Sequence, residues 1–178
     1  MKKENIKKIC LSAVMAALYM GLDFLAVSIS APFGGSMKLS ISGLPIIIIS
    51  SFFGPLWGAA TGFVGAFLGQ LITYGFGATT LIWVLPAVAR GLVFGLLFKA
   101  FKKSLKPYIL CIETVISALV VTAVNSIVMY IDSVVYAYTS VILGVALINR
   151  IIAAVITSII FALILPPILK VLKKIIKI

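Results

Sequence analysis

The chain has 178 residues, of which 63% are hydrophobic and only 11% are charged, whereas about a quarter of the residues in a soluble domain are charged. This composition excludes a soluble globular protein and indicates a membrane protein. Because a spanning helix needs ~20 apolar residues, the chain accommodates about six spans and leaves no room for a fused ATPase or catalytic domain.

Apolar runs predict six membrane helices in a single all-α domain. The second run ends at Gly54-Pro55, which cannot continue a regular helix because proline lacks a backbone N–H. Pro166-Pro167 is expected to close the last run in the same way. Loops are expected at residues 30–42, 75–79 and 131–138. The predicted spans cover residues 6–28, 44–53, 56–74, 80–98, 108–130 and 139–165.

The net charge of +11 is unevenly distributed along the chain. Twelve of the 15 basic residues form three lysine clusters, at residues 2–8, 99–106 and 170–177. Six alternating spans place all three clusters on one side of the membrane and only Lys38 on the other. This bias predicts a bacterial plasma-membrane protein with both termini in the cytoplasm, where the lysines contact anionic lipid headgroups rather than nucleic acid.

Groups that could support catalysis are scarce. The sequence has no histidine, no phosphate-binding glycine loop and no paired carboxylates, so neither a metal nor another cofactor is expected. A membrane-embedded enzyme would have to depend on Asp23 or Asp132. Uptake driven by ATP would require separate ATPase subunits.

Two arginines are predicted to lie near the middle of the bilayer. Arg90 and Arg150 each lie about 15 Å from the outer end of their predicted spans. Each costs roughly 2.5–3.5 kcal/mol there unless it is paired. Either they hold an anionic group of a ligand, or they are structural and interact with Asp23, Asp132 or helix carbonyls. The two interpretations are balanced for Arg90, whereas the polar neighbour Asn149 favours ligand binding for Arg150.

Other polar and aromatic residues occur in the outer halves of the predicted spans, and together they could line one outward-facing pocket. Such a pocket would suit a flat molecule rich in heteroatoms. Aromatic side chains also gather at membrane interfaces, and that alternative is favoured for Tyr74, Trp83 and Tyr130. The full set of candidates is Gln70, Tyr74, Trp83, Asn125 and Tyr130.

Small residues recur at every fourth position of the first predicted span. Ala13, Ala17 and Gly21 give one helical face a smooth stripe, and Ala16 lies beside it. Such a stripe allows another helix to approach closely, and that helix could be internal or belong to a partner.

Three segments resemble the substrate-binding S components of energy-coupling factor (ECF) transporters, through which bacteria take up vitamins. They are LSAVMAALYMG, MKLSISGLPIIIISSFFGPLWGAATGFVGAFLGQ and TTLIWVLPAVARGLVFGLLFK, in the family's order and spacing. The resemblance implies a six-helix bundle with a vitamin site in its outer half. It also implies that the loop at 30–42, which carries Lys38, covers this site.

The resemblance further implies partners and a class of ligand. The face with Ala13 and Ala17 would dock on a transmembrane coupling (T) subunit joined to two ATPases. The ARGLVFG segment is closest to the members that bind folate or pantothenate, both of which are anionic. This agrees with two membrane arginines and with the expectation that no acidic residue lies in the core.

The sequence therefore predicts a non-enzymatic subunit that captures a small anionic vitamin, with folate or pantothenate favoured. The alternative is a self-sufficient small channel or secondary transporter, in which the arginines and Gln70 line a continuous path.

Overall fold

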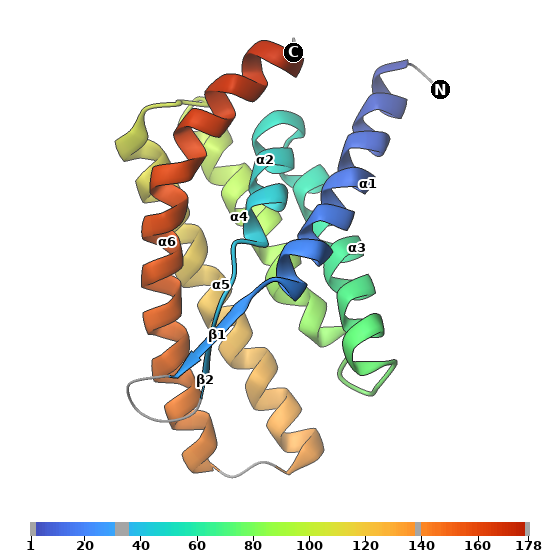
Figure 1. The fold of residues 1–178 in the computed structure, drawn as a ribbon, viewed down its shortest axis with the longest axis vertical. Coiled ribbons are helices and arrows are strands. Elements are labelled where there is room, and N and C mark those ends of the chain that lie inside the picture. The colour runs from blue at the N-terminus through green and yellow to red at the C-terminus, as the bar shows by residue number, and fades with distance from the viewer. Residues whose placement is uncertain (1–2, 31–35, 138–139, 177–178) are drawn as a thin grey trace.

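The computed structural model describes the backbone of residues 3–30, 36–137 and 140–176, and the side chains of residues 4–26, 39–137 and 147–174. This part of the chain forms six α-helices, as predicted, together with a short antiparallel hairpin and one 3₁₀ turn (Figure 1). In chain order the elements are α1 (Lys3–Phe24), β1 (Val27–Ser30), β2 (Ser36–Leu39), α2 (Gly43–Phe53), α3 (Pro55–Tyr74), η1 (Ile82–Val84), α4 (Leu85–Ala100), α5 (Pro107–Tyr136) and α6 (Ser140–Ile176).

Helix α2 is the centre of the bundle. It contacts α1, α3, α4 and α6, and nine of its eleven residues are buried. At 1.5 Å per residue it is roughly 16 Å long, about half the hydrocarbon thickness of a bilayer. In the described part of the chain, five helical segments are long and apolar enough to span: α1, α3, α5, α6, and α4 taken together with η1. In Figure 1 α2 occupies the upper half of the bundle, and the segment leading from β2 crosses the lower half.

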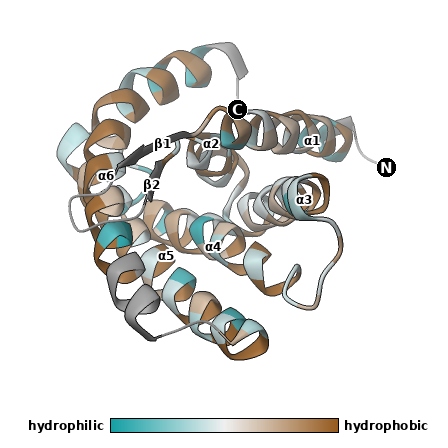
Figure 2. Cartoon of the chain, turned by 60° about the horizontal axis from the view of Figure 1, so that its bottom comes forward, coloured by the Kyte–Doolittle hydropathy of each residue, from teal (hydrophilic) through white to brown (hydrophobic). Residues whose placement is uncertain are grey.

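The five long helices surround α2 incompletely. Each long helix contacts the next in the order α6, α5, α4, α3, α1. The two helices at the ends of this series, α1 and α6, do not touch in the described residues. The hairpin lies between these two helices (Figure 2), and β2 contacts α6. The hairpin pairs Val27 with Leu39 and Ser30 with Ser36.

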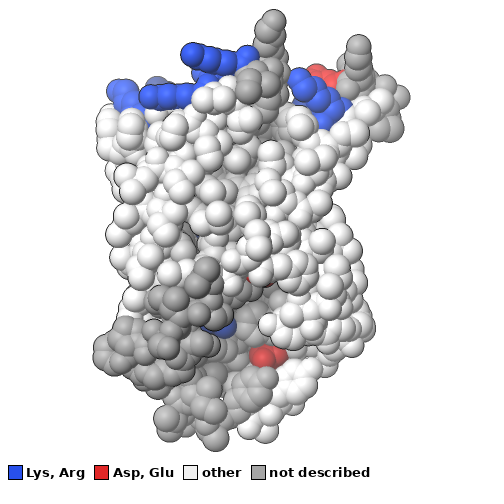
Figure 3. Space-filling model, in the orientation of Figure 1, with Lys and Arg blue, Asp and Glu red and all other residues white. Residues whose placement is uncertain are grey.

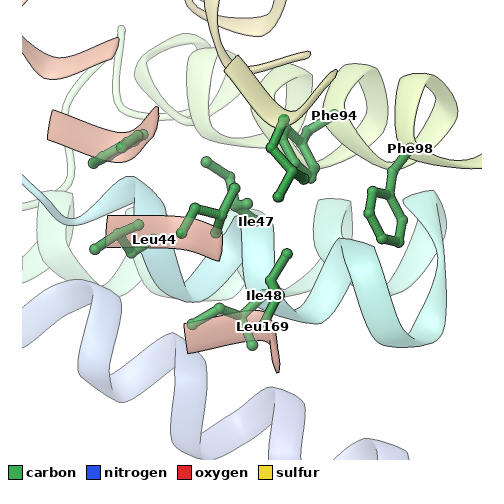
Figure 4. Close-up of a cluster of buried hydrophobic side chains, with 9 residues drawn as sticks. Leu44, Ile47, Ile48, Phe94, Phe98 and Leu169 are labelled. Atoms are coloured by element: carbon green, nitrogen blue, oxygen red, sulfur yellow. The ribbon is translucent and has the colours of Figure 1, made fainter. Parts of the chain in front are cut away.

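Aliphatic residues of α2 form the main hydrophobic core with aromatic residues of α4 and leucines of α6 (Figure 4). Burial of these side chains fixes the short helix between its long neighbours. The buried members of the cluster are Leu44, Ile47, Ile48, Phe94, Phe98, Leu110, Phe161, Leu165 and Leu169.

Helices α3 and α4 approach each other at backbone distance. A Cβ atom added to Gly91 of α4 would lie 2.3 Å from the carbonyl carbon of Gly58 on α3. Ser50 of α2 donates a hydrogen bond from its hydroxyl to the Gly91 carbonyl at 2.9 Å. Three helices therefore meet where only small residues fit.

Several predicted boundaries are wrong. The first helix ends at Phe24 instead of residue 28, because residues 27–30 form strand β1. This strand pairs with β2, which lies within the predicted loop at 30–42. The fourth span begins with a 3₁₀ turn, and α4 proper starts at Leu85. The predicted loop at 131–138 is mostly helix, since α5 continues to Tyr136 and ends with Ala137 in a left-handed conformation.

Pro166-Pro167 also fails to end its helix, because α6 continues to Ile176. Two prolines remove two helical hydrogen bonds, but unravelling the chain in an apolar environment would leave more backbone groups without partners. Leu165 and Leu169, on either side of the prolines, are both 0% exposed. Core packing therefore holds the helix together through the prolines.

The start of α1 and the end of α6 lie at the same end of the bundle (Figure 1). Lysine side chains gather at this end, and the rest of the visible face is almost free of charge (Figure 3). The turn between α4 and α5, residues 101–106, is also at this end. The described lysines of the three clusters therefore lie at one end of the bundle.

We expect Gly91→Ala to lower the free energy of unfolding by roughly 1–3 kcal/mol, because the added methyl group collides with the α3 backbone. Gly69→Ala is the matched control, since only Met20 Cγ, at 3.9 Å, lies near its added Cβ. Thermal unfolding of the detergent-solubilised proteins measures both. Equal melting temperatures for the two variants would contradict the close approach of α3 and α4.

Candidate ligand-binding site

Arg150 of α6 forms a polar cluster with three residues of η1 and α5. The Arg150 Cζ atom lies 5.4 Å from the centre of the Trp83 ring, and its Nη1 donates a hydrogen bond to the Asn125 carbonyl at 3.2 Å. The indole Nε1 of Trp83 donates to Asp132 Oδ1 at 3.1 Å. We call Arg150, Trp83, Asn125 and Asp132 the Arg150 cluster.

Local structure explains how this cluster forms. Trp83 lies on η1, the short turn that precedes α4 and contacts α5. Asp132 is buried on the extension of α5 that the sequence assigned to a loop. Asn149, next to Arg150 on α6, is also buried, at 4% exposure. Trp83 is half-buried, and its ring lies beside Arg150 while its indole donates to Asp132. Its predicted preference for the membrane interface stays a prediction.

Arg90 belongs to a second polar group, at the first turn of α2. A Cβ atom added to Gly43 would lie 3.0 Å from Arg90 Cδ, Nε and Nη1, so the guanidinium group packs against the start of α2. Its Cζ atom lies 5.7 Å from the centre of the Phe161 ring. Here the absence of a side chain at Gly43 makes room for the arginine.

Helix α1 contributes to the same region. The Ser42 hydroxyl donates to Asp23 Oδ1 at 3.2 Å, and Ser40 donates to Ser42 at 2.8 Å. Tyr19 lies within electrostatic reach of both Asp23 and Arg90. Sequence reasoning missed Tyr19, although its four-residue spacing from Asp23 could have indicated a polar face on α1. We call Arg90, Tyr19, Asp23 and Ser42 the Arg90 cluster.

The sequence left open that Arg90 and Arg150 are structural residues, paired with Asp23, Asp132 or helix carbonyls. Neither guanidinium group forms a salt bridge with any described residue. Asp132 accepts from Trp83, and Asp23 accepts from Ser42. Arg150 does bond a helix carbonyl, which satisfies one of its five N–H groups. Each guanidinium group therefore lies beyond salt-bridge distance of the described acids, and Arg150 keeps further N–H donors.

Among the described side chains, those of Tyr74, Tyr130 and Gln70 are not brought into contact with these clusters. Tyr74 is 78% exposed at the end of α3, and Tyr130 is 65% exposed on α5. Gln70 is half-buried one turn before Tyr74. Lys38 lies on β2 opposite Ser28, and its side chain is outside the described part. For these residues ligand contact stays a prediction.

The expectation of an acid-free core is wrong. Glu113 on α5 is 0% exposed, and neither carboxylate oxygen has a hydrogen-bond partner. Ser117, one turn along the same face, is also buried without a partner for its hydroxyl. The sequence did not indicate that Glu113 is buried, because a single acidic residue near the start of an apolar helix can face either way. Which way it faces depends on how α5 is rotated.

The small-residue stripe of α1 faces away from the bundle. Ala13 and Ala17 are exposed, whereas Ala16 is 2% exposed and packs inward. A Cβ atom added to Gly21 would meet nothing within 4 Å. Of the five candidate spans, α1 has the smallest buried share. No described helix of this chain covers the stripe, so the internal-partner alternative fails for Ala13 and Ala17.

Apolar helices around internal polar clusters define a multi-pass membrane protein of the kind that binds or moves solutes. Residues 3–174 match the family model of the ECF-type riboflavin transporter S component, so the chain belongs to this family. It is therefore a substrate-binding component of a transporter rather than a member of an enzyme family.

A solved structure agrees with this fold. The protein described in "Structure and mechanism of the S component of a bacterial ECF transporter" matches with a TM-score of 0.60 and 21% sequence identity. The match covers 95% of this chain and 99% of that chain, and at this identity it supports the fold alone. No curated protein sequence matches the chain.

We expect Trp83→Phe to lower the free energy of unfolding by roughly 1–3 kcal/mol, because it removes the donor to buried Asp132 while keeping a ring beside Arg150. Trp57→Phe is the control, since that indole donates no hydrogen bond to a described residue. Thermal unfolding distinguishes them. If Trp83→Phe is no less stable than Trp57→Phe, the bond to Asp132 is unimportant.

Proposed function

We propose that this chain captures a vitamin on the outer side of a bacterial plasma membrane and delivers it inward with separate T and ATPase subunits. Membership of the S component family supports the binding role. The single structural observation that carries the proposal is the Arg150 cluster, in which a half-buried guanidinium group lies against an indole with no described acid within salt-bridge distance of it.

The proposed orientation places the lysine-rich end in the cytoplasm. Positive loops are retained inside during membrane insertion, and all three lysine clusters lie at one end. The opposite end, with the hairpin and the Arg150 cluster, then faces outward. In this orientation the polar groups are on the side where an importer first meets its substrate.

Riboflavin is the ligand that we consider first. The matching family model describes riboflavin transport, and a flavin is a flat ring system edged with carbonyl and ring-nitrogen acceptors. Trp83 offers an aromatic face, and the free N–H groups of Arg150 offer donors for such acceptors. Asn149 adds a buried amide beside them.

An anionic vitamin such as folate or pantothenate is the second candidate, and one observation favours it. Arg90 and Arg150 both lack acidic partners among the described residues, so each could bind a ligand carboxylate. Arg90 also lies at the first turn of α2, where the helix dipole favours negative charge.

Replacing Arg150 distinguishes these ligands. For either ligand, Arg150→Ala should weaken binding by about 1.5–3 kcal/mol, because charge-assisted hydrogen bonds are lost. Arg150→Gln should restore much of the affinity for uncharged riboflavin, which needs only donors, but little for a carboxylate. Flavin fluorescence quenching and calorimetry with folate and pantothenate measure the dissociation constants.

Lys99→Gln, an exposed basic residue at the lysine-rich end, is the control for loss of charge alone. A dissociation constant unchanged in Arg150→Ala, for every vitamin bound, would return Arg150 to a purely structural role.

The exposed face of α1 is proposed to dock on the T subunit. We expect Ala13→Leu and Ala17→Leu to abolish vitamin uptake by the reconstituted complex while changing vitamin affinity less than about twofold, since both side chains point away from the polar clusters. Ala123→Leu, at an exposed alanine of α5, is the matched control and should transport normally.

Proteoliposomes with and without the T and ATPase subunits provide the measurement. Loss of vitamin binding in the α1 variants would contradict the assignment of this face. Uptake by the isolated chain under an ion gradient would instead support the alternative of a self-sufficient transporter.

A further inference from the structure

A recess lies at the lysine-rich end of the bundle, opposite the end that carries the hairpin. It is formed by the end of α2, the end of α4, the turn at 101–106 and the last turns of α6. Its lining residues are Ser51, Phe52, Phe98, Lys103, Leu105, Leu169 and Lys173. This recess plays no part in the function proposed above.

The recess combines an apolar interior with a basic rim. Phe98 and Leu169 are almost fully buried members of the main core, and both are visible in Figure 4. The Ser51 hydroxyl is occupied as a donor to the Ile47 carbonyl at 2.8 Å. Lys103 and Lys173 are exposed and carry the only charges among the lining residues.

Two features of the backbone place these lysines at the recess. Lys173 is positioned by the part of α6 that continues past Pro166-Pro167. Lys103 lies in a turn where Lys102 and Lys103 both have positive φ, at 54° and 55°. The Lys103 N–H donates to the Phe98 carbonyl at 2.8 Å, which closes the end of α4. Glycine adopts this conformation at lower cost, so the turn holds lysines at an energetic disadvantage.

The charge of the two lining lysines is not compensated by a salt bridge to any described acid. Of the four acidic residues in the chain, Glu4 forms a salt bridge with Lys8 on α1, and Glu113 is buried in α5. Asp23 and Asp132 belong to the two clusters on the other side. An anion at the recess would therefore meet two ammonium groups with no competing carboxylate among the lining residues.

We propose that this recess binds one anionic phospholipid, with its phosphate held by Lys103 and Lys173 and its glycerol and upper acyl chain against the partly exposed Phe52 and Leu105. The position suits a lipid, because the lysines lie where apolar helices end and headgroups begin. A free phosphate ion would use the ammonium groups but would leave the apolar wall uncovered. The combination of wall and rim therefore favours an amphiphile.

The test compares two double variants of equal charge in the full-length protein. Lys103→Gln with Lys173→Gln removes both lining lysines. Lys102→Gln with Lys174→Gln removes their immediate neighbours, which do not line the recess, and it also changes one residue of the positive-φ turn. Titration of phosphatidylglycerol against a phosphatidylcholine background, followed by native mass spectrometry, measures lipid bound per chain.

We expect the wild type and the neighbour variant to retain one phosphatidylglycerol at similar affinity. The lining variant should bind it roughly 30-fold more weakly, because the usual contributions of two lysines to headgroup binding are lost. Lys103→Arg with Lys173→Arg should restore binding, because arginine also binds phosphate. If both glutamine variants lose the same affinity for phosphatidylglycerol, the lipid is attracted by the general surface charge and not by this recess, and the proposal is overturned. Displacement of the lipid by millimolar inorganic phosphate would show a simple anion site and overturn it as well.

Discussion

Backbone N–H and C=O groups at the depth of the hydrocarbon layer must find partners inside the protein, and the short helix α2 determines how this chain meets that requirement. Because α2 is only about half as long as a span, the chain crosses the other half of the bundle's centre without helical hydrogen bonds. Local bonds replace them there: Ser42 N–H donates to Ser40 Oγ, and Leu44 N–H donates to the Ile41 carbonyl. Non-helical backbone of this kind is tolerated only where it is buried in protein or lines a cavity. We therefore expect a ligand cavity, if there is one, near the end of α1, the start of α2 and η1.

Both arginines belong to this half of the bundle. Arg90 packs against the first residue of α2, in space that exists because residue 43 is glycine. Arg150 lies against Trp83, on the turn that delays the start of α4. The irregular elements therefore help to position both polar clusters, and the α2, α4 and α6 core holds the regular helices around them. The same division separates the proposed vitamin site from the lysine-rich end, where regular helices end at the headgroup level.

The sequence predicted the number of helices and the clustering of lysines well, because apolar length and charge are local properties. It placed Trp83 and Asn125 in the outer halves of their spans and Arg150 near the middle of the bilayer. It could not show that they touch, since contact depends on the rotation of three helices. Proline and aspartate were misleading for a related reason. Pro166-Pro167 and Asp132 are local signals for a helix end, yet core packing around Leu165 and the bond from Trp83 override them. Glu113 was missed because its burial is set by neighbours far along the chain.

Hydrogen–deuterium exchange of residues 39–51 tests most directly whether the non-helical segment before α2 lines a ligand cavity. In the empty protein, the account predicts measurable exchange at residues 39–43 and strong protection at residues 46–51, which form the buried core of α2. Saturating riboflavin, or the anionic vitamin that binds in its place, should slow exchange at 39–43 and leave 46–51 unchanged. Full protection of residues 39–43 before ligand is added, with no change afterwards, would contradict a cavity at this depth.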